Sequence, residues 1–184
     1  MNNYFIKLLT ITCILNVLFV DSVMAVSNKG SDISRLIQSS DLIVQGRFSR
    51  VSTLWENNKV YTKGVFLIDK TIKGNADGSI VVKKIGGTII HPVLKTEITM
   101  KTSNGINFRL EDEVILMLDL SSNDEYVIKG MQGMLKVETI NGIKVVSGIR
   151  KIIGKNETGD NVVSSRKMTI DEFSIFVREN GDKN

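Results

Sequence analysis

Cysteine, proline and histidine are almost absent from this chain, which has one of each among its 184 residues. One cysteine cannot form an internal disulfide, and Cys₄ or Cys₂His₂ zinc sites need ligands that the sequence does not hold. A single histidine leaves few routes to His-based catalysis. The composition is otherwise that of a globular protein, with 42% hydrophobic and 24% charged residues. We therefore expect a folded protein with no metal or other cofactor and no enzymatic activity.

Residues 1–25 have the three parts of a secretory signal peptide. Lys7 supplies a positive charge, an apolar run covers residues 8–20, and Ala25 offers a small residue for cleavage. The run is shorter than the roughly 20 apolar residues of a membrane span. An uncleaved anchor is the alternative, because Val23-Met24-Ala25 fits the cleavage pattern loosely. We predict export by the secretory route, cleavage after Ala25, and a periplasmic or extracellular protein that is not integral to the membrane.

Residues 26–184 contain no cysteine, so a secreted domain of this length depends on its hydrophobic core. Loss of the signal segment removes one Lys and one Asp and leaves the net charge at +4. The basic residues are spread along the chain without a stripe of basic and aromatic side chains, so we do not expect nucleic-acid binding. A single domain is expected over residues 26–184.

Strands dominate the expected secondary structure. A short helix is expected at residues 31–38, because Ile33, Leu36 and Ile37 share one helical face. Asn141-Gly142 predicts a tight hairpin, since both residues tolerate positive φ. A long polar and mobile loop is expected over residues 149–166. Strands are expected at residues 42–51, 60–72, 79–85, 98–100, 113–120, 126–128, 134–138 and 144–146.

A second helix is expected at the C-terminus. Thr169-Ile170-Asp171-Glu172 matches a capping box, in which the Thr hydroxyl and the Glu carboxylate each bind a backbone amide of the first turn. Ile170, Phe173, Phe176 and Val177 then form one apolar stripe. We expect this stripe to pack on the sheet; the alternative is an exposed docking face for a partner.

The pattern of strands with few helices indicates a β-barrel or a β-sandwich, and the long first strands with glycines at bends favour a small barrel. The terminal helices would cover its open ends or faces. In a barrel, Gly46 and Gly64 would mark places where a strand bends or another backbone passes close.

Several short blocks of the sequence carry a resemblance: residues 41–48, Trp55, Tyr61-Thr62, residues 71–74, Gly86-Gly87, Phe108, residues 112–118, Tyr126 and residues 130–133. In this order they resemble an uncharacterised group of secreted bacterial domains. The first two blocks are also similar to the opening strands of netrin-like, or tissue-inhibitor-of-metalloproteinase-like, OB-fold domains, and similar bacterial domains occur beside matrixin-type proteases. The resemblance implies an OB-like β-barrel and a protease-associated role. The inhibitors chelate zinc through an N-terminal Cys, which residues 26–184 lack, so that mechanism is not implied.

Two groups of side chains are candidates for partner binding. Trp55 and Tyr61 are predicted to face each other across the Asn57-Asn58 turn, either as a platform for a peptide or sugar or as a pair that stabilises the hairpin. The second group is Met131, Gln132 and Met134, although Met often only fills gaps in a core.

Other chemically capable residues are interpreted as structural. His91 lacks a second His or Cys, so a loop residue without a metal or catalytic role is expected. Glu111-Asp112-Glu113 is expected to be a solvated turn rather than a calcium site. The favoured function is an exported, non-enzymatic binding module for a protein or a cell-envelope component. The alternatives are a self-assembling surface protein and a hydrolase that uses carboxylates such as Asp112 or Glu113.

Overall fold

The computed structural model describes residues 33–102, 105–121, 124–130, 132–155, 158–159 and 161–181. The predicted signal segment and Met131 lie outside these residues. The described elements are α2 (Ile33–Ser39), β1 (Leu42–Glu56), β2 (Lys59–Lys73), β3 (Ser79–Ile85), β4 (Gly87–Ile90), β5 (Glu97–Met100), β6 (Glu113–Leu120), β7 (Tyr126–Ile128), β8 (Met134–Ile140), β9 (Ile143–Lys155), β10 (Asn161–Thr169) and α3 (Ile170–Gly181).

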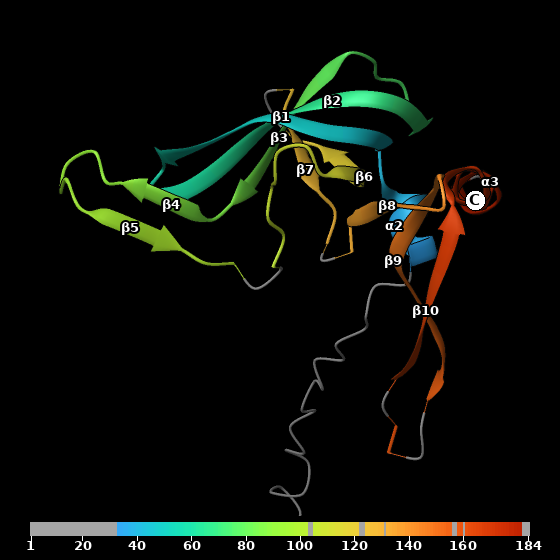
Figure 1. The fold of residues 1–184 in the computed structure, drawn as a ribbon. Coiled ribbons are helices and arrows are strands. Elements are labelled where there is room, and N and C mark those ends of the chain that lie inside the picture. Colours follow the sequence, from blue (N-terminus) through green and yellow to red (C-terminus); the bar gives the residue numbers. More distant parts are fainter. Residues whose placement is uncertain are drawn as a thin grey trace, which may run out of the picture.

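The main sheet closes on itself. Its order begins β1-β2-β3-β7-β6, and β6 pairs back with β1, so five strands form a ring (Figure 1). The pairing within the ring is shortest between β3 and β7, which run parallel. These strands share two residue pairs, Val82 with Tyr126 and Lys83 with Val127. From β6 the sheet continues through β8, β9 and β10. The predicted class is confirmed: a mainly β chain with a closing sheet and a short helix at each end.

Two hydrophobic cores lie on opposite faces of β1 and β6. Successive strand residues point to opposite faces, so a strand that is buried on both sides reads as a continuous apolar run. The barrel core contains Leu42, Val44, Phe48, Phe66, Val82, Val114, Leu116 and Leu118. The outer core takes the alternate residues Ile43, Ile115 and Met117 and joins them to both helices and to β8, β9 and β10.

Helix α3 seals the outer core. Thr169 and Glu172 form the predicted capping box: the Thr169 amide donates to the Glu172 carboxylate at 2.8 Å, and the Glu172 amide donates to the Thr169 hydroxyl at 3.2 Å. Phe173 and Val177 are buried, while Phe176 is partly buried against the same core. The apolar stripe therefore packs against the protein, as predicted.

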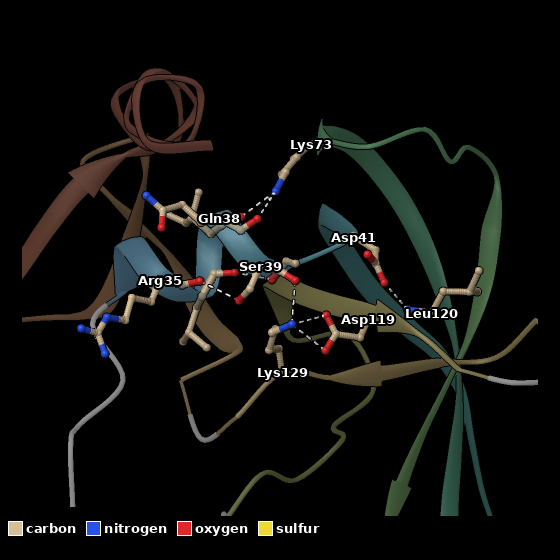
Figure 2. Close-up of polar contacts among 11 residues, drawn as sticks. Arg35, Gln38, Ser39, Asp41, Lys73, Asp119, Leu120 and Lys129 are labelled. Carbon is tan, nitrogen blue, oxygen red and sulfur yellow. Dashed lines mark hydrogen bonds and ion pairs between the residues drawn. The ribbon is translucent and has the colours of Figure 1, made fainter. Parts of the chain in front are cut away.

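Two lysines hold the C-terminal end of α2 against the barrel (Figure 2). Lys73, at the end of β2, donates to the carbonyls of Ile37 and Gln38 at 2.8 and 2.9 Å. Lys129 donates to the Ser39 carbonyl at 2.6 Å and also pairs with Asp119. The last carbonyls of a helix lack partners within it and carry partial negative charge, so cations stabilise them.

The predicted mobile loop over residues 149–166 is wrong. Most of this segment belongs to β9 and β10, which form a long antiparallel hairpin that projects from the body of the protein (Figure 1). The hairpin between β8 and β9 is confirmed, with positive φ at Asn141 and Gly142. Among the described residues, no helix is long and apolar enough to cross a lipid bilayer.

Candidate partner-binding site

An arm extends from one end of the barrel (Figure 1). We define the arm as residues 51–62, which are the outer halves of β1 and β2, together with the β4–β5 hairpin, residues 87–100. Thr53 joins the two parts, because its hydroxyl donates to the Thr88 carbonyl at 2.9 Å. Within the hairpin, the Thr88 and Thr99 hydroxyls are 2.9 Å apart. The arm is therefore tied together by hydrogen bonds between its layers.

The predicted facing pair of Trp55 and Tyr61 is wrong. Asn57 and Asn58 both have positive φ and form a two-residue turn, which places Glu56 opposite Lys59. In this register Trp55 is opposite Val60, and Tyr61 is opposite Leu54. Because side chains alternate along a strand, Trp55 and Tyr61 lie on opposite faces of the arm.

Trp55 packs instead on His91, with 4.4 Å between ring centroids and an interplanar angle of 68°. The His91 Nδ1 atom accepts hydrogen bonds from the amides of Val93 and Leu94, at 3.2 and 3.0 Å. The His91 carbonyl accepts from the Lys95 amide at 3.0 Å. His91 therefore fixes the connection between β4 and β5, a structural role that its lone occurrence in the sequence did not reveal.

This fixed connection presents three large apolar side chains to solvent. We call residues 90–95 the tip. Ile90 is 66% exposed, Val93 78% and Leu94 63%. Isolated apolar residues on a surface are ordinary, but adjacent ones at the end of a projecting hairpin are typical of interaction sites. The strand after the connection was expected at residues 98–100; the missed signal was the β-branched stretch before it, Thr88-Ile89-Ile90.

On the Tyr61 face, the arm and the ring enclose a groove of about 340 Å³. Lys63 pairs with Glu125 at 2.5 Å, and Lys83 pairs with Glu56 at 2.6 Å and with Glu125 at 3.6 Å. The Lys83 ammonium also lies 4.3 Å from the centroid of the Tyr61 ring. The groove is lined by Glu56, Asn57, Tyr61, Lys83, Lys84, Ile85, Ser121, Glu125 and Val127.

The ion pairs of the groove shift the pKa values of their members. The hydrogen bond from Lys63 holds the pKa of Glu125 below its usual range, against an opposing effect of burial. The hydrogen bond to Glu56 raises the pKa of Lys83, with a further contribution from the charge of Glu125. Both groups are thus favoured in their charged forms.

We expect Glu125→Gln to lower the free energy of unfolding at neutral pH and to make that free energy depend less on pH in the acidic range. The lowered pKa of folded Glu125 provides stability above the pKa of the unfolded chain, and this stability is lost as the pH falls through the folded value. The loss at pH 7 should be about 1 kcal/mol, because the pair is partly solvated. Denaturant unfolding between pH 7 and pH 3 measures it, with Glu97→Gln on the exposed side of β5 as control. Equal pH profiles for wild type and Glu125→Gln would contradict the expectation.

Lys84 lies on the side of β3 that faces the barrel interior. Ile80, Val82 and Lys84 alternate onto the same side, and Lys84 stands opposite buried Thr62. Burial lowers the pKa of Lys84, and no described acidic residue forms an ion pair with it. Its ammonium lies 5.5 Å from the centroid of the Phe108 ring. The mouth of the barrel therefore holds a cation where the strand pattern would place an apolar residue.

We expect Lys84→Met to stabilise the protein. Replacing a partly buried ammonium that no described carboxylate pairs with by an apolar side chain of similar length removes a desolvation cost, here about 1 kcal/mol after loss of the contact with Phe108. The melting temperature should rise by about 2–4 °C. Lys59→Met, at the exposed β1–β2 turn, should leave it unchanged. A lower melting temperature for Lys84→Met would show that its charge is compensated in the free protein.

The second predicted group is Met131, Gln132 and Met134, and its described members do not form an exposed patch. Met134 begins β8 and packs against the barrel core, which is the gap-filling role. The Gln132 Oε1 atom is buried and has no hydrogen-bond partner among the described residues. Met131 lies outside the described residues, so its candidacy stays a prediction.

Glu113, from the acidic run, is bound by its neighbours. Gln45 donates to its carboxylate at 2.5 Å and Lys144 at 2.8 Å. Burial favours a higher pKa, but these two hydrogen bonds and the charges of Lys144 and Arg47 outweigh it and hold the pKa of Glu113 below its usual range. Within the described ranges, no three His, Cys, Asp or Glu side chains gather as a metal site would require.

Comparison with known proteins gives no relative for this chain: no protein-family model, curated protein or solved structure matches it.

Proposed function

We propose that this protein is an exported, non-enzymatic binding module that contacts a protein or a cell-envelope component through the tip of its arm. The observation that carries the proposal is the exposure of Ile90, at the end of β4, and of Val93 and Leu94 on the following connection, which His91 holds in place. Full burial of an aliphatic side chain of this size contributes about 1.5–3 kcal/mol. A turn that is already fixed loses little further conformational freedom on binding, so more of this energy becomes affinity.

The direction of the pKa shift at Glu113 argues against a general-acid role for this carboxylate. A carboxylate acting as a general acid near neutral pH needs a raised pKa. Glu113 and Glu125 instead have lowered pKa values, because each accepts hydrogen bonds from a lysine. Both are held as charged members of ion pairs, which suits a structural role.

Self-assembly through the sheet edge is the less favoured alternative. β10 is the terminal strand of the sheet order, and an open strand edge can pair with another chain. Its exposed residues include Arg166 and Lys167 beside Ser164 and Ser165. Charges at an edge oppose pairing with a second copy, so we expect the mass measured by light scattering to stay that of a monomer as concentration rises.

Export and the link to proteases rest on the sequence alone. The signal segment supports an envelope or extracellular partner, and the resemblance of the opening strands to netrin-like domains makes a secreted protease one candidate. The absence of cysteine from residues 26–184 argues that any such contact is made by apolar side chains rather than by zinc chelation.

Site-specific photo-crosslinking in the exporting cell tests the proposal. A photoreactive residue replaces Ile90 at the tip or, as a matched control, Ile175, which is 52% exposed on the outer side of α3. We expect a discrete crosslinked product from position 90 that is absent from position 175. Identical products from both positions, or none from position 90, would overturn the assignment of the tip.

A further inference from the structure

Lys84 faces a hollow at the mouth of the barrel, separate from the tip. The hollow has a volume of about 290 Å³ and opens beside the last pair between β3 and β7, Lys83 with Val127. Its walls are mostly apolar, and it is lined by Lys83, Lys84, Ile85, Thr102, Ile106, Val127 and Ile128. A second hollow of about 340 Å³ shares Lys84, Thr102 and Ile106 with it.

Lys84 differs from the lysines around it because its charge has no acidic partner among the residues described here. Lys63 and Lys83 share Glu125, and Lys129 pairs with Asp119. Lys84 stands among Ile85, Ile106 and Ile128, and among the residues described here no carboxylate reaches it. A cation in apolar surroundings is destabilising unless an anion joins it, so this place in the fold is suited to a negatively charged ligand.

The surroundings also select the kind of anion. A phosphate dianion is normally held by several donors or by a guanidinium, whereas the first hollow is lined mostly by aliphatic side chains. Its second ammonium, that of Lys83, is already paired with Glu56 and Glu125, which leaves Lys84 as the lysine of this lining without an acidic partner among the described residues. A single carboxylate attached to an apolar group satisfies both features. The carboxylate would meet the ammonium, and the apolar group would cover Ile106 and Ile128.

We propose that Lys84 binds the carboxylate of a small amphipathic ligand whose aliphatic part fills the hollow between β3, β7 and Ile106. Two sources share this chemistry: a free aliphatic acid, and the C-terminus of a peptide that ends in an apolar residue. The site is independent of partner binding at the tip. The site also explains why a lysine occupies an inward-facing position of β3. A charge at a binding site can destabilise the ligand-free protein, and the bound ligand then offsets this cost.

Calorimetric titration of the purified protein tests the site with four probes. Octanoate is compared with octanol, and a tripeptide ending in Leu is compared as free acid and as amide. We expect at least one acid to bind about tenfold or more tighter than its neutral counterpart. A preference for octanoate alone identifies an aliphatic acid as the ligand, and a preference for the free-acid peptide identifies a C-terminus.

The variants connect the preference to Lys84. Lys84→Met should abolish the advantage of acid over neutral probe, and Lys84→Arg should retain part of it. Lys59→Met, which removes an equal charge from the exposed turn, should leave it intact. The proposal is wrong if neither acid exceeds its neutral counterpart in the wild type, or if the preference survives in Lys84→Met while that variant remains folded by circular dichroism.

Discussion

Replacing Phe173 by Ala is expected to lower the free energy of unfolding by about 3–5 kcal/mol, a large share of the 5–15 kcal/mol typical of a domain. Phe173 is completely buried in the outer core, where α3 meets α2 and the sheet. Removing the ring leaves a cavity as well as losing apolar contact, and the surrounding strands are held by backbone hydrogen bonds and cannot fully close it.

Two neighbours on the same helix provide controls for Phe173→Ala. Phe176→Ala should cost less, because Phe176 is only partly buried, and Ile175→Ala should change stability little, because Ile175 lies on the exposed side. Denaturant unfolding of the three variants measures the order. Equal losses at positions 173 and 175, or a melting temperature of Phe173→Ala within about 2 °C of wild type, would contradict the packing of α3.

Gly46→Ala is expected to be equally damaging for the opposite reason, because it adds an atom where there is no room. A Cβ at Gly46 would overlap the carbonyl oxygen of Leu67 on β2, and a ring carbon of Phe66 would lie 3.0 Å away. The backbone of β1 is fixed here by pairing with both β2 and β6, so it cannot move aside. We expect a loss of about 3 kcal/mol or failure to fold.

Gly154→Ala is the matched control. Gly154 also lies in a strand, β9, but no heavy atom of the described part of the chain lies within 4 Å of its would-be Cβ. Its replacement should change the free energy of unfolding by less than about 1 kcal/mol. Soluble yield and chemical unfolding report both variants. A Gly46→Ala protein as stable as Gly154→Ala would show that the ring of strands is looser than its pairing indicates.

Local rules predicted the elements whose signals are local. Thr169 and Glu172 identified the start of α3, and Asn141-Gly142 identified a hairpin, because caps and tight turns depend on a few adjacent residues. Gly46 was expected where a strand bends or another backbone passes close, and the backbone of Leu67 does pass close to it. At Gly64 the neighbour is the ring of Phe48 rather than a backbone, which the sequence could not distinguish.

Two of the sequence predictions were wrong because they depended on how strands pair. The β9–β10 hairpin was missed because Ser164, Ser165, Arg166 and Lys167 form a run of exposed polar residues without alternating apolar ones. The strand is held by hydrogen bonds to its partner strand instead. Trp55 and Tyr61 were assigned a register one residue from the real one, which moves a side chain to the other face. The two-residue turn at Asn57-Asn58 would have corrected it.

The candidate site was predicted only in part. Trp55 lies in the arm, but its neighbour His91 directly follows β4, a strand that the sequence patterns did not identify. Lys84 could have been noticed as a charge following Ile80 and Val82 at alternating positions. Its isolation from acidic residues depends on how β3 and β7 meet, and this is a property of the folded ring.

The dissociation constant of the partner captured at the tip, measured for the wild type and for Val93→Ser/Leu94→Ser, tests the central claim most directly. Both residues are exposed, so the double variant should melt within about 2 °C of wild type. We predict affinity weakened by at least about tenfold, because the variant removes the apolar contact surface. An unchanged dissociation constant for a folded double variant would contradict the account.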